Sequence, residues 1–179
     1  MSLILVTGGV RSGKSGFAEE LASETGKKVL YVATGEAKDE EMRSRIALHQ
    51  ARRPAEWGCV EIPQYLSHSN QAAKEYEVVL IDCLSTWVSN WLMAVPEEDW
   101  RSEAITQEIY QEAKAWLDGL SASPQTVIAV TSEVGLGGVA MHKLGRWFAD
   151  VLGDVNQMTA RRADTVYTVF SGIPWRIKG

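Results

Sequence analysis

Several common structural devices are sparse or missing in this sequence. Its two cysteines, Cys59 and Cys83, are too few for a disulfide framework and do not have the spacing of a metal site. This usage suits a reducing compartment and predicts a cytoplasmic protein. Basic residues are not in excess, because the formal net charge is −5. The sequence therefore lacks the basic face that a sequence-independent nucleic-acid binder needs.

Long apolar runs are absent too. The N-terminal run is only as long as a strand and has no charged leader, so we expect no signal peptide. The longest later run, 84–95, contains Ser85, Ser89 and Asn90, and it is too short and too polar to span a bilayer. With 45% hydrophobic and 23% charged residues, the 179-residue chain is expected to form a single globular domain, 1–179.

Apolar, β-rich runs alternate along the chain with helical patterns. The runs are continuous rather than alternating in polarity, which is typical of parallel strands covered on both faces. They lie at 3–7, 28–33, 78–82, 126–131 and 165–170. Helical patterns fill the gaps at about 14–25, 38–50, 84–94, 98–119 and 143–162. This order predicts βαβ units in an α/β, doubly wound, mostly parallel sheet with flanking helices, and 175–178 could add an edge strand.

The octapeptide at residues 8–15 is the most specific local motif. It reads Gly8-Gly9-Val10-Arg11-Ser12-Gly13-Lys14-Ser15 and fits G-x-x-x-x-G-K-[ST], the phosphate-binding loop (P-loop). It follows an apolar strand and precedes a helical pattern, which is the context the motif requires. Its amides and Lys14 are predicted to bind nucleotide phosphates, and the Ser15 hydroxyl to ligate Mg²⁺. The alternative is a glycine-rich turn that only joins a strand to a helix.

An acidic residue, Asp82, ends the apolar run Val78-Val79-Leu80-Ile81. A P-loop site needs an acid in this position to help hold Mg²⁺ opposite the Ser15 hydroxyl. The alternative is that Asp82 caps the helix that follows it. The two roles are compatible.

A histidine lies at the end of the helical pattern 39–49. Met42, Ile46 and His49 share one face, and arginines lie nearby at Arg45, Arg52 and Arg53. Several arginines around an imidazole suggest a bound anion, and neutral imidazole is a nucleophile that could attack an α-phosphate. From the pattern alone, a histidine that interacts with the helix C-terminus is the favoured alternative.

Longer strings extend these matches over nearly the whole chain, in order. Besides 6–15, they are Tyr31-Val32-Ala33-Thr34, Asp39-Glu40-Glu41-Met42, Arg45-Ile46 with His49, Arg53-Pro54, Trp57, Asp82-Cys83-Leu84, Ser132-Glu133-Val134-Gly135, Val155-Asn156-Gln157 and Ser171-Gly172-Ile173-Pro174. On these strings the chain resembles the bifunctional adenosylcobinamide kinase / adenosylcobinamide-phosphate guanylyltransferase family of cobalamin biosynthesis.

The resemblance implies a P-loop NTPase-type, RecA-like fold and two reactions. ATP or GTP phosphorylates adenosylcobinamide, and GTP then gives GMP to adenosylcobinamide phosphate through a covalent histidine intermediate, at His49, with release of pyrophosphate. Lys14 is the second catalytic residue that the resemblance implies. For His49, the resemblance replaces the structural role at a helix C-terminus, which the pattern alone favoured, with a catalytic one. A homotrimer is also implied.

The resemblance further implies a set of nucleotide-binding residues. They are Gly8, Gly9, Val10, Arg11, Ser12, Gly13, Lys14, Ser15, Ala33, Thr34, Gly35, Gln50, Ala51, Arg52, Arg53, Glu61 and Asp82. Of these, Ser15 and Asp82 are the expected Mg²⁺ ligands. Glu61 is a plausible acceptor for guanine N–H groups that spacing alone does not single out.

Two departures from the family pattern concern the corrinoid side. Ser132 replaces an expected Asn and Ala140 replaces an expected Pro. Trp87 and Trp91, at i and i+4, could present a flat surface to a corrin ring, although such a pair is more often core.

Two rival functions remain at this point. A small-metabolite kinase in which His49 is structural would transfer only a γ-phosphate, without pyrophosphate. A nucleotide-dependent switch or partner-binding ATPase would hydrolyse nucleotide slowly, at a partner-dependent rate, with no small-molecule acceptor.

Overall fold

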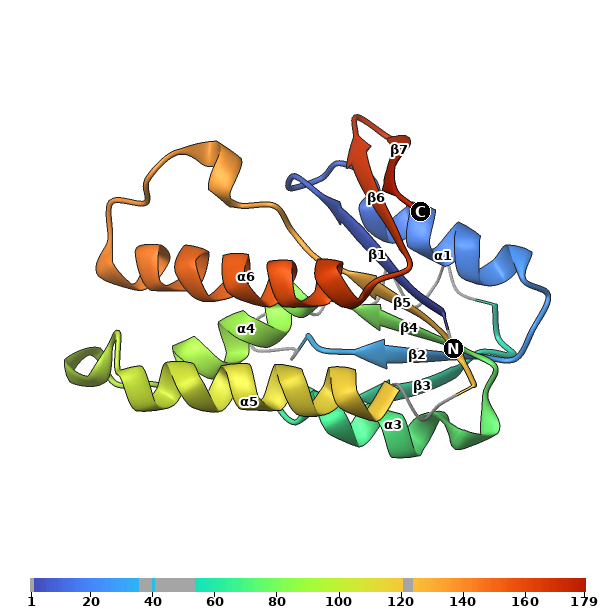
Figure 1. Ribbon diagram of the computed structural model, residues 1–179, viewed down its shortest axis with the longest axis horizontal. Helices are drawn as coiled ribbons and strands as arrows, with labels where there is room; N and C mark the ends of the chain where they lie inside the picture. The colour runs from blue at the N-terminus through green and yellow to red at the C-terminus, as the bar shows by residue number, and fades with distance from the viewer. Residues whose placement is uncertain (1, 36–39, 41–53, 121–123) are drawn as a thin grey trace.

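One seven-stranded sheet organises the molecule. The computed structural model describes residues 2–35, 40, 54–120 and 124–179. The strand order is β3-β2-β4-β5-β1-β6-β7, and all neighbours are parallel except β6 and β7 (Figure 1). The strands are β1 (Ser2–Gly8), β2 (Val29–Ala33), β3 (Gly58–Glu61), β4 (Val78–Asp82), β5 (Thr126–Val130), β6 (Thr165–Phe170) and β7 (Ile173–Lys178).

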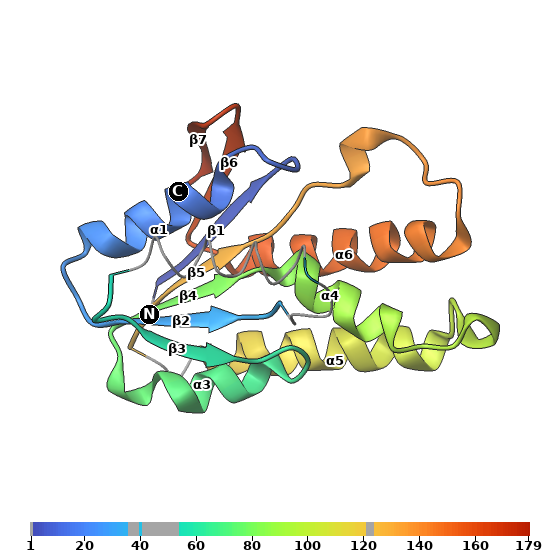
Figure 2. The same ribbon diagram turned by 180° about the vertical axis from the view of Figure 1, so that it is seen from behind.

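Helices cover both faces of this sheet. Helix α1 lies on one face, and α4, α5 and α6 lie on the other, as Figures 1 and 2 show from opposite sides. The helices are α1 (Lys14–Glu24), α3 (Ser69–Ala72), α4 (Leu84–Met93), α5 (Glu103–Leu120) and α6 (Lys143–Arg162), and short 3₁₀ turns occur at 66–68, 73–75, 97–99 and 135–137. Within the described residues, no helix is both long and apolar enough to cross a membrane.

The continuous apolar strands are explained by a core on each face. In β4, Val79 and Ile81 join the larger core under α4, α5 and α6, whereas Val78 and Leu80 join the smaller core under α1. Successive side chains of a strand point to opposite faces, so a strand buried on both faces needs apolar residues throughout. The predicted mostly parallel, doubly wound sheet is thereby confirmed, including the edge strand at the C-terminus.

Two short elements were not predicted, and one helix begins later than expected. Strand β3 at the sheet edge is only 4 residues long and α3 is also 4 residues long, too short for a periodic signal. Helix α5 begins at Glu103 instead of 98, after a 3₁₀ turn and a left-handed residue, Arg101, with φ 71°. The helix expected at 38–50 lies outside the described residues, apart from Glu40.

The tryptophan pair of α4 belongs to the core. Trp87 is fully buried and Trp91 is 7% exposed, and their rings meet edge to face with centroids 6.5 Å apart. Both indole N–H groups donate to the carbonyl of Gln64. The core interpretation therefore holds, and these rings offer no open platform to a corrin ring.

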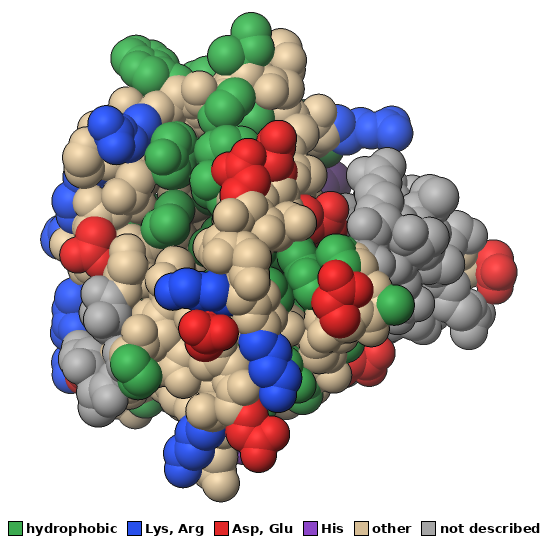
Figure 3. All heavy atoms as spheres, turned by 90° about the vertical axis from the view of Figure 1, so that its right-hand side faces the viewer, with side chains coloured by type: hydrophobic (Ala, Val, Ile, Leu, Met, Phe, Trp, Pro, Cys, Tyr) green, Lys and Arg blue, Asp and Glu red, His purple; other side chains and the backbone are tan. Residues whose placement is uncertain are grey.

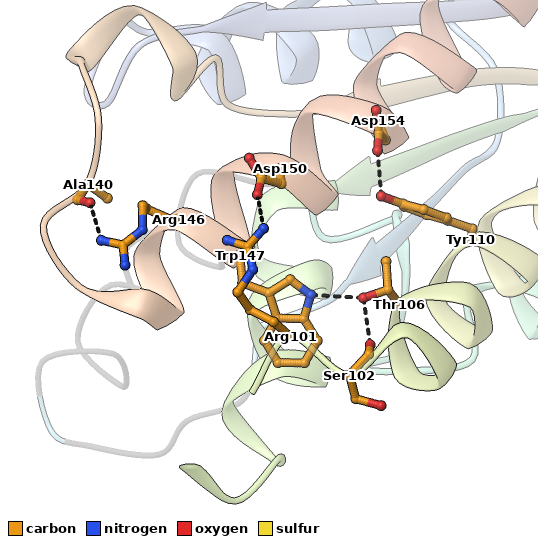
Figure 4. Close-up of polar contacts among 9 residues, drawn as sticks. All are labelled: Arg101, Ser102, Thr106, Tyr110, Ala140, Arg146, Trp147, Asp150 and Asp154. Carbon is orange, nitrogen blue, oxygen red and sulfur yellow. Dashed lines mark hydrogen bonds and ion pairs between the residues drawn. The ribbon is translucent and has the colours of Figure 1, made fainter. Parts of the chain in front are cut away.

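Polar contacts fasten α5 and its preceding turn to α6 (Figure 4). The Trp147 indole donates to Thr106 Oγ1 at 2.9 Å, and the Tyr110 hydroxyl donates to Asp154 at 2.5 Å. Burial, together with the neighbouring Asp154 carboxylate, raises the pKa of Tyr110 and so favours the protonated phenol that donates this bond. The exposed Arg101–Asp150 ion pair adds little, as surface pairs generally do.

The C-terminal hairpin presents an apolar surface. Every residue of β7 is exposed, including Ile173, Trp175 and Ile177. Figure 3 shows hydrophobic side chains gathered at the top of one face, where the β6–β7 hairpin lies.

The contrast between the two tryptophan environments can be tested. Trp87→Ala should lower the free energy of unfolding by about 3–5 kcal/mol, because it empties a buried site. Trp175→Ala, at a position 64% exposed, should cost less than about 1 kcal/mol. Urea titration of both variants measures the difference, and equal losses would contradict the packing described for α4.

Candidate functional site

The carboxyl ends of the parallel strands form one edge of the sheet, and the predicted site residues lie along it. The register aligns Glu61 with Ala33, Ala33 with Asp82, Asp82 with Val130, and Val130 with Val6. Neighbouring strands are about 4.8 Å apart, so this row extends roughly 19 Å from β3 to β1. The P-loop begins at one end of the row and Glu61 stands at the other.

Close backbone approach explains the two motif glycines of the P-loop. A Cβ at Gly8 would lie 2.6 Å from the Val169 carbonyl oxygen of the neighbouring β6. Gly13 has φ 95° and precedes the first residue of α1, and a Cβ there would lie 3.2 Å from Gly172 Cα. Only glycine fits both positions without a shift of the backbone.

The loop is arranged to receive an anion at the N-terminus of α1. Lys14 Nζ donates to the Gly9 carbonyl at 3.0 Å, which holds the ammonium over the loop. The Ser12 hydroxyl oxygen is buried and has no hydrogen-bond partner among the residues that the structure describes. Amides at a helix N-terminus carry partial positive charge, so a phosphate bound here would satisfy several donors at once.

Asp82 lies beside the loop. Its carboxylate accepts a hydrogen bond from Ser15 Oγ at 3.3 Å and another from the Tyr31 hydroxyl at 3.0 Å. Adjacent ligands of an octahedral Mg²⁺, each about 2.1 Å from the ion, lie about 3 Å apart, so the Ser15 and Asp82 oxygens are spaced suitably for one ion. No pattern in the sequence indicated that Tyr31, inside an apolar strand, would contact this carboxylate.

The described residues contain no group of three or more His, Cys, Asp or Glu side chains that could hold a metal by themselves. A P-loop Mg²⁺ site does not depend on such a group. Such an ion takes one or two protein ligands and completes its shell with water and substrate phosphates.

Cys83, rather than Asp82, caps helix α4. The Cys83 sulfur accepts from the Thr86 amide at 3.4 Å and lies 2.9 Å from the Ser85 hydroxyl. The helix-cap alternative for Asp82 is therefore wrong, and its carboxylate faces Ser15 instead. Enclosure of the thiol, and secondarily the charge of Asp82, raise the pKa of Cys83 and keep it neutral.

The predicted contact residues Ala33, Thr34 and Gly35 follow one another at the end of β2. Thr34 is fully buried, and its hydroxyl accepts from the Cys83 amide and donates to the Cys83 carbonyl, each at 2.8 Å. Its own carbonyl accepts from Asn90 Nδ2 at 2.7 Å. Thr34 thus fastens β2 to the end of β4 and to α4, while nucleotide contact in this segment stays a prediction.

The remaining predicted residues divide into two groups. Glu61 is exposed at the end of the edge strand β3. His49, Gln50, Ala51, Arg52 and Arg53 lie outside the described residues.

A polar clamp at the end of β5 was not predicted. Asn156 of α6, only 8% exposed, accepts from the Thr131 hydroxyl at 2.6 Å and donates to the Ser132 carbonyl at 3.0 Å. Ser132 also accepts from the Ser85 hydroxyl at 3.2 Å. Asn156 belongs to one of the strings that match the family, Val155-Asn156-Gln157, but helical periodicity did not predict which residues it would contact.

The fold and this loop define a P-loop nucleotide-binding protein of the RecA-like class. Two solved structures share its fold: a KaiC-like protein from Pyrococcus horikoshii (TM-score 0.52, 16% identity, covering 93% of this chain and 70% of that one) and a RadB recombinase (TM-score 0.50, 17% identity, covering 93% and 73%). At these identities the likeness concerns the fold alone.

Sequence comparison gives the family. The chain belongs to the cobinamide kinase / cobinamide phosphate guanyltransferase family, whose model matches residues 4–177. The bifunctional adenosylcobalamin biosynthesis protein CobU of Escherichia coli is 40% identical over 98% of this chain and 99% of its own length. CobP of Pseudomonas aeruginosa, described by the same bifunctional name, is 39% identical over 98% of this chain and 96% of its own length.

The thiol environment predicts a difference in reactivity between the two cysteines. The thiolate is the nucleophile, so the neutral and half-buried Cys83 should alkylate with iodoacetamide much more slowly than the exposed Cys59. Mass spectrometry of timed samples at pH 8 measures both rates in one protein. Equal rates in the folded protein would contradict the half-buried, neutral state of the Cys83 thiol.

Proposed function

We propose that this enzyme carries out both steps on one corrinoid. The first step phosphorylates the hydroxyl of adenosylcobinamide with ATP or GTP as donor. The second transfers GMP from GTP to adenosylcobinamide phosphate and releases pyrophosphate. The single observation that supports the proposal best is the Ser15–Asp82 contact at the mouth of the P-loop, in a chain of this family.

In the kinase step the loop would hold the donor phosphates. The amides of residues 9–15 and the Lys14 ammonium would neutralise charge that builds on the phosphoryl oxygens in the transition state. Lys14 would exchange its contact with the Gly9 carbonyl for a phosphate oxygen. Mg²⁺ held by Ser15 and Asp82 would supply further charge neutralisation when bound.

In the guanylyl step His49 would be the nucleophile. A nitrogen of the neutral imidazole forms a bond to the α-phosphorus of GTP, while the bond from that phosphorus to the pyrophosphate oxygen breaks. An oxygen of the corrinoid phosphate then attacks the same phosphorus and the imidazole leaves. Support for this half comes from the family and from Arg45, Arg52 and Arg53, whose charges suit an anionic substrate.

The nucleotide would lie along the row of strand ends. With its phosphates at the P-loop, its guanine would point toward Glu61, whose carboxylate can accept from guanine N–H groups. The segments Ala33–Gly35 and Gln50–Arg53 would complete the contacts.

We also propose that the enzyme works in the cytoplasm as a homotrimer. Light scattering of the purified protein would test the trimer.

Removal of the loop ammonium should impair nucleotide use. Lys14→Ala should lower the rate of phosphoryl transfer by on the order of 10²–10³-fold, since one charged stabiliser of the transition state is lost. Lys27→Ala, at an exposed position after α1, is the matched control and should keep the wild-type rate. Steady-state assays with labelled ATP measure both variants. A Lys14→Ala enzyme as fast as the control would overturn the role given to the loop.

The covalent step has a direct chemical test. Incubation with α-labelled GTP should leave acid-labile, base-stable label on the wild-type protein, as expected for a phosphoramidate, and none on His49→Ala. His68→Ala, at an exposed histidine packed against Tyr65, is the control and should label fully. Unlabelled wild-type protein would rule out the covalent intermediate.

A further inference from the structure

Three acidic residues stand at or just beyond the carboxyl ends of the described parallel strands: Glu61 ends β3, Asp82 ends β4 and Glu133 follows β5. Asp82 is engaged by Ser15 and Tyr31, and Glu61 stands at the far edge of the sheet, four strands from β1. Asp82 thus belongs to the phosphate site and Glu61 to the proposed guanine site, and neither site gives a role to the third acid, Glu133.

The backbone of Glu133 is attached to the P-loop. Strand β5 lies between β4 and β1, and the Glu133 amide donates to the Gly8 carbonyl at 3.0 Å. Two residues earlier, the Thr131 amide donates to the Val6 carbonyl at 2.9 Å. Glu133 therefore sits between the start of the phosphate loop and the strand that carries Asp82, where the γ-phosphate would lie.

The backbone of Glu133 is also held from the side of helix α6. The clamp from Asn156 fixes Thr131 and Ser132, the two residues before Glu133. Precise placement of a side chain over a reacting group depends on such support from its neighbours. The replacement of the expected Asn by Ser132 leaves the clamp intact, because Asn156 bonds to the Ser132 backbone carbonyl.

The Glu133 carboxylate itself stays available. The residue is exposed, forms no ion pair with a described residue, and accepts only a long contact of 3.4 Å from the Gly135 amide. The loop after it carries exposed apolar side chains, with Leu136 78%, Val139 86% and Met141 90% exposed. Arg146 anchors the far end of this loop by donating to the Ala140 carbonyl at 3.1 Å (Figure 4). It also donates to the Met141 carbonyl at 2.7 Å.

The available carboxylate of Glu133 and the exposed apolar side chains of the loop after it suit one kind of acceptor. A large, partly apolar acceptor would rest on the loop side chains and bring its hydroxyl to the Glu133 carboxylate. A carboxylate that accepts the proton of the attacking hydroxyl is the usual base of phosphoryl transfer to alcohols.

We propose that Glu133 is the general base of the kinase half-reaction and takes no part in guanylyl transfer. The acceptor oxygen forms a bond to the γ-phosphorus, the bond from that phosphorus to the β-phosphate oxygen breaks, and the hydroxyl proton passes to Glu133. Guanylyl transfer needs no such base, because its acceptor is a phosphate that is already ionised. The inference rests on the proposed two-step function.

The test separates the two half-reactions in one variant. Glu133→Gln should lower kcat for phosphorylation of adenosylcobinamide by about 10²–10⁴-fold, with KM for ATP unchanged. Transfer of GMP to chemically supplied adenosylcobinamide phosphate should stay within about twofold of wild type. Glu108→Gln, an exposed glutamate on α5, is the matched control and should keep both rates. Added formate should restore part of the kinase rate to Glu133→Ala, since it can replace the missing carboxylate.

Each other result contradicts the assignment. A wild-type kinase rate in Glu133→Gln would remove any role for the carboxylate. Equal losses in both reactions would make Glu133 a structural or metal-site residue, and a raised KM for adenosylcobinamide with unchanged kcat would make it a substrate contact. If the wild-type enzyme itself transfers no phosphate to adenosylcobinamide, the proposed function fails, which is a different outcome from these.

Discussion

The parallel register of β4, β5 and β1 is the constraint on which the rest of the structure depends. It brings the ends of three strands, separate in sequence, to one edge of the sheet, so that Asp82 meets the P-loop residue Ser15. Both faces of these strands are buried, so a slip by one residue would exchange the apolar cores and separate the carboxylate from the hydroxyl. Core packing therefore sets the geometry of the site.

The ends of the strands are held by polar groups that do not belong to the phosphate site. Thr34 fastens β2 to β4, Cys83 caps α4, and Asn156 fastens the end of β5 to α6. These partly buried hydrogen bonds are costly to leave unmade, so each one limits how far its strand end can move. A nucleotide would thus meet a site whose framework is largely formed before it binds.

The P-loop and the strands of the parallel core could be predicted from the sequence, because each is encoded in one short segment. The P-loop motif lies between its strand and helix, and the apolar runs give the strands of the parallel core. Contacts across the sheet could not be predicted in the same way. The Tyr31–Asp82 bond and the Asn156 clamp join residues that are far apart in the chain, and no periodicity in one segment reports on the other.

The two halves of the proposed chemistry differ in their support. The phosphate loop, Asp82 and the backbone of Glu133 are held by contacts among described residues, whereas the roles proposed for His49 and its arginines rest on the family to which the chain belongs. A single nucleotide site that serves both proposed halves requires ATP or GTP to react there at the γ-phosphorus and GTP to react there at the α-phosphorus. That requirement distinguishes this enzyme from a simple kinase and from a nucleotide-dependent switch.

The most direct measurement follows the phosphate product of GTP in the presence of adenosylcobinamide phosphate. The account predicts one pyrophosphate released for each adenosylcobinamide-GDP formed. Release of orthophosphate alone, with no pyrophosphate and no guanylylated corrinoid, would contradict it.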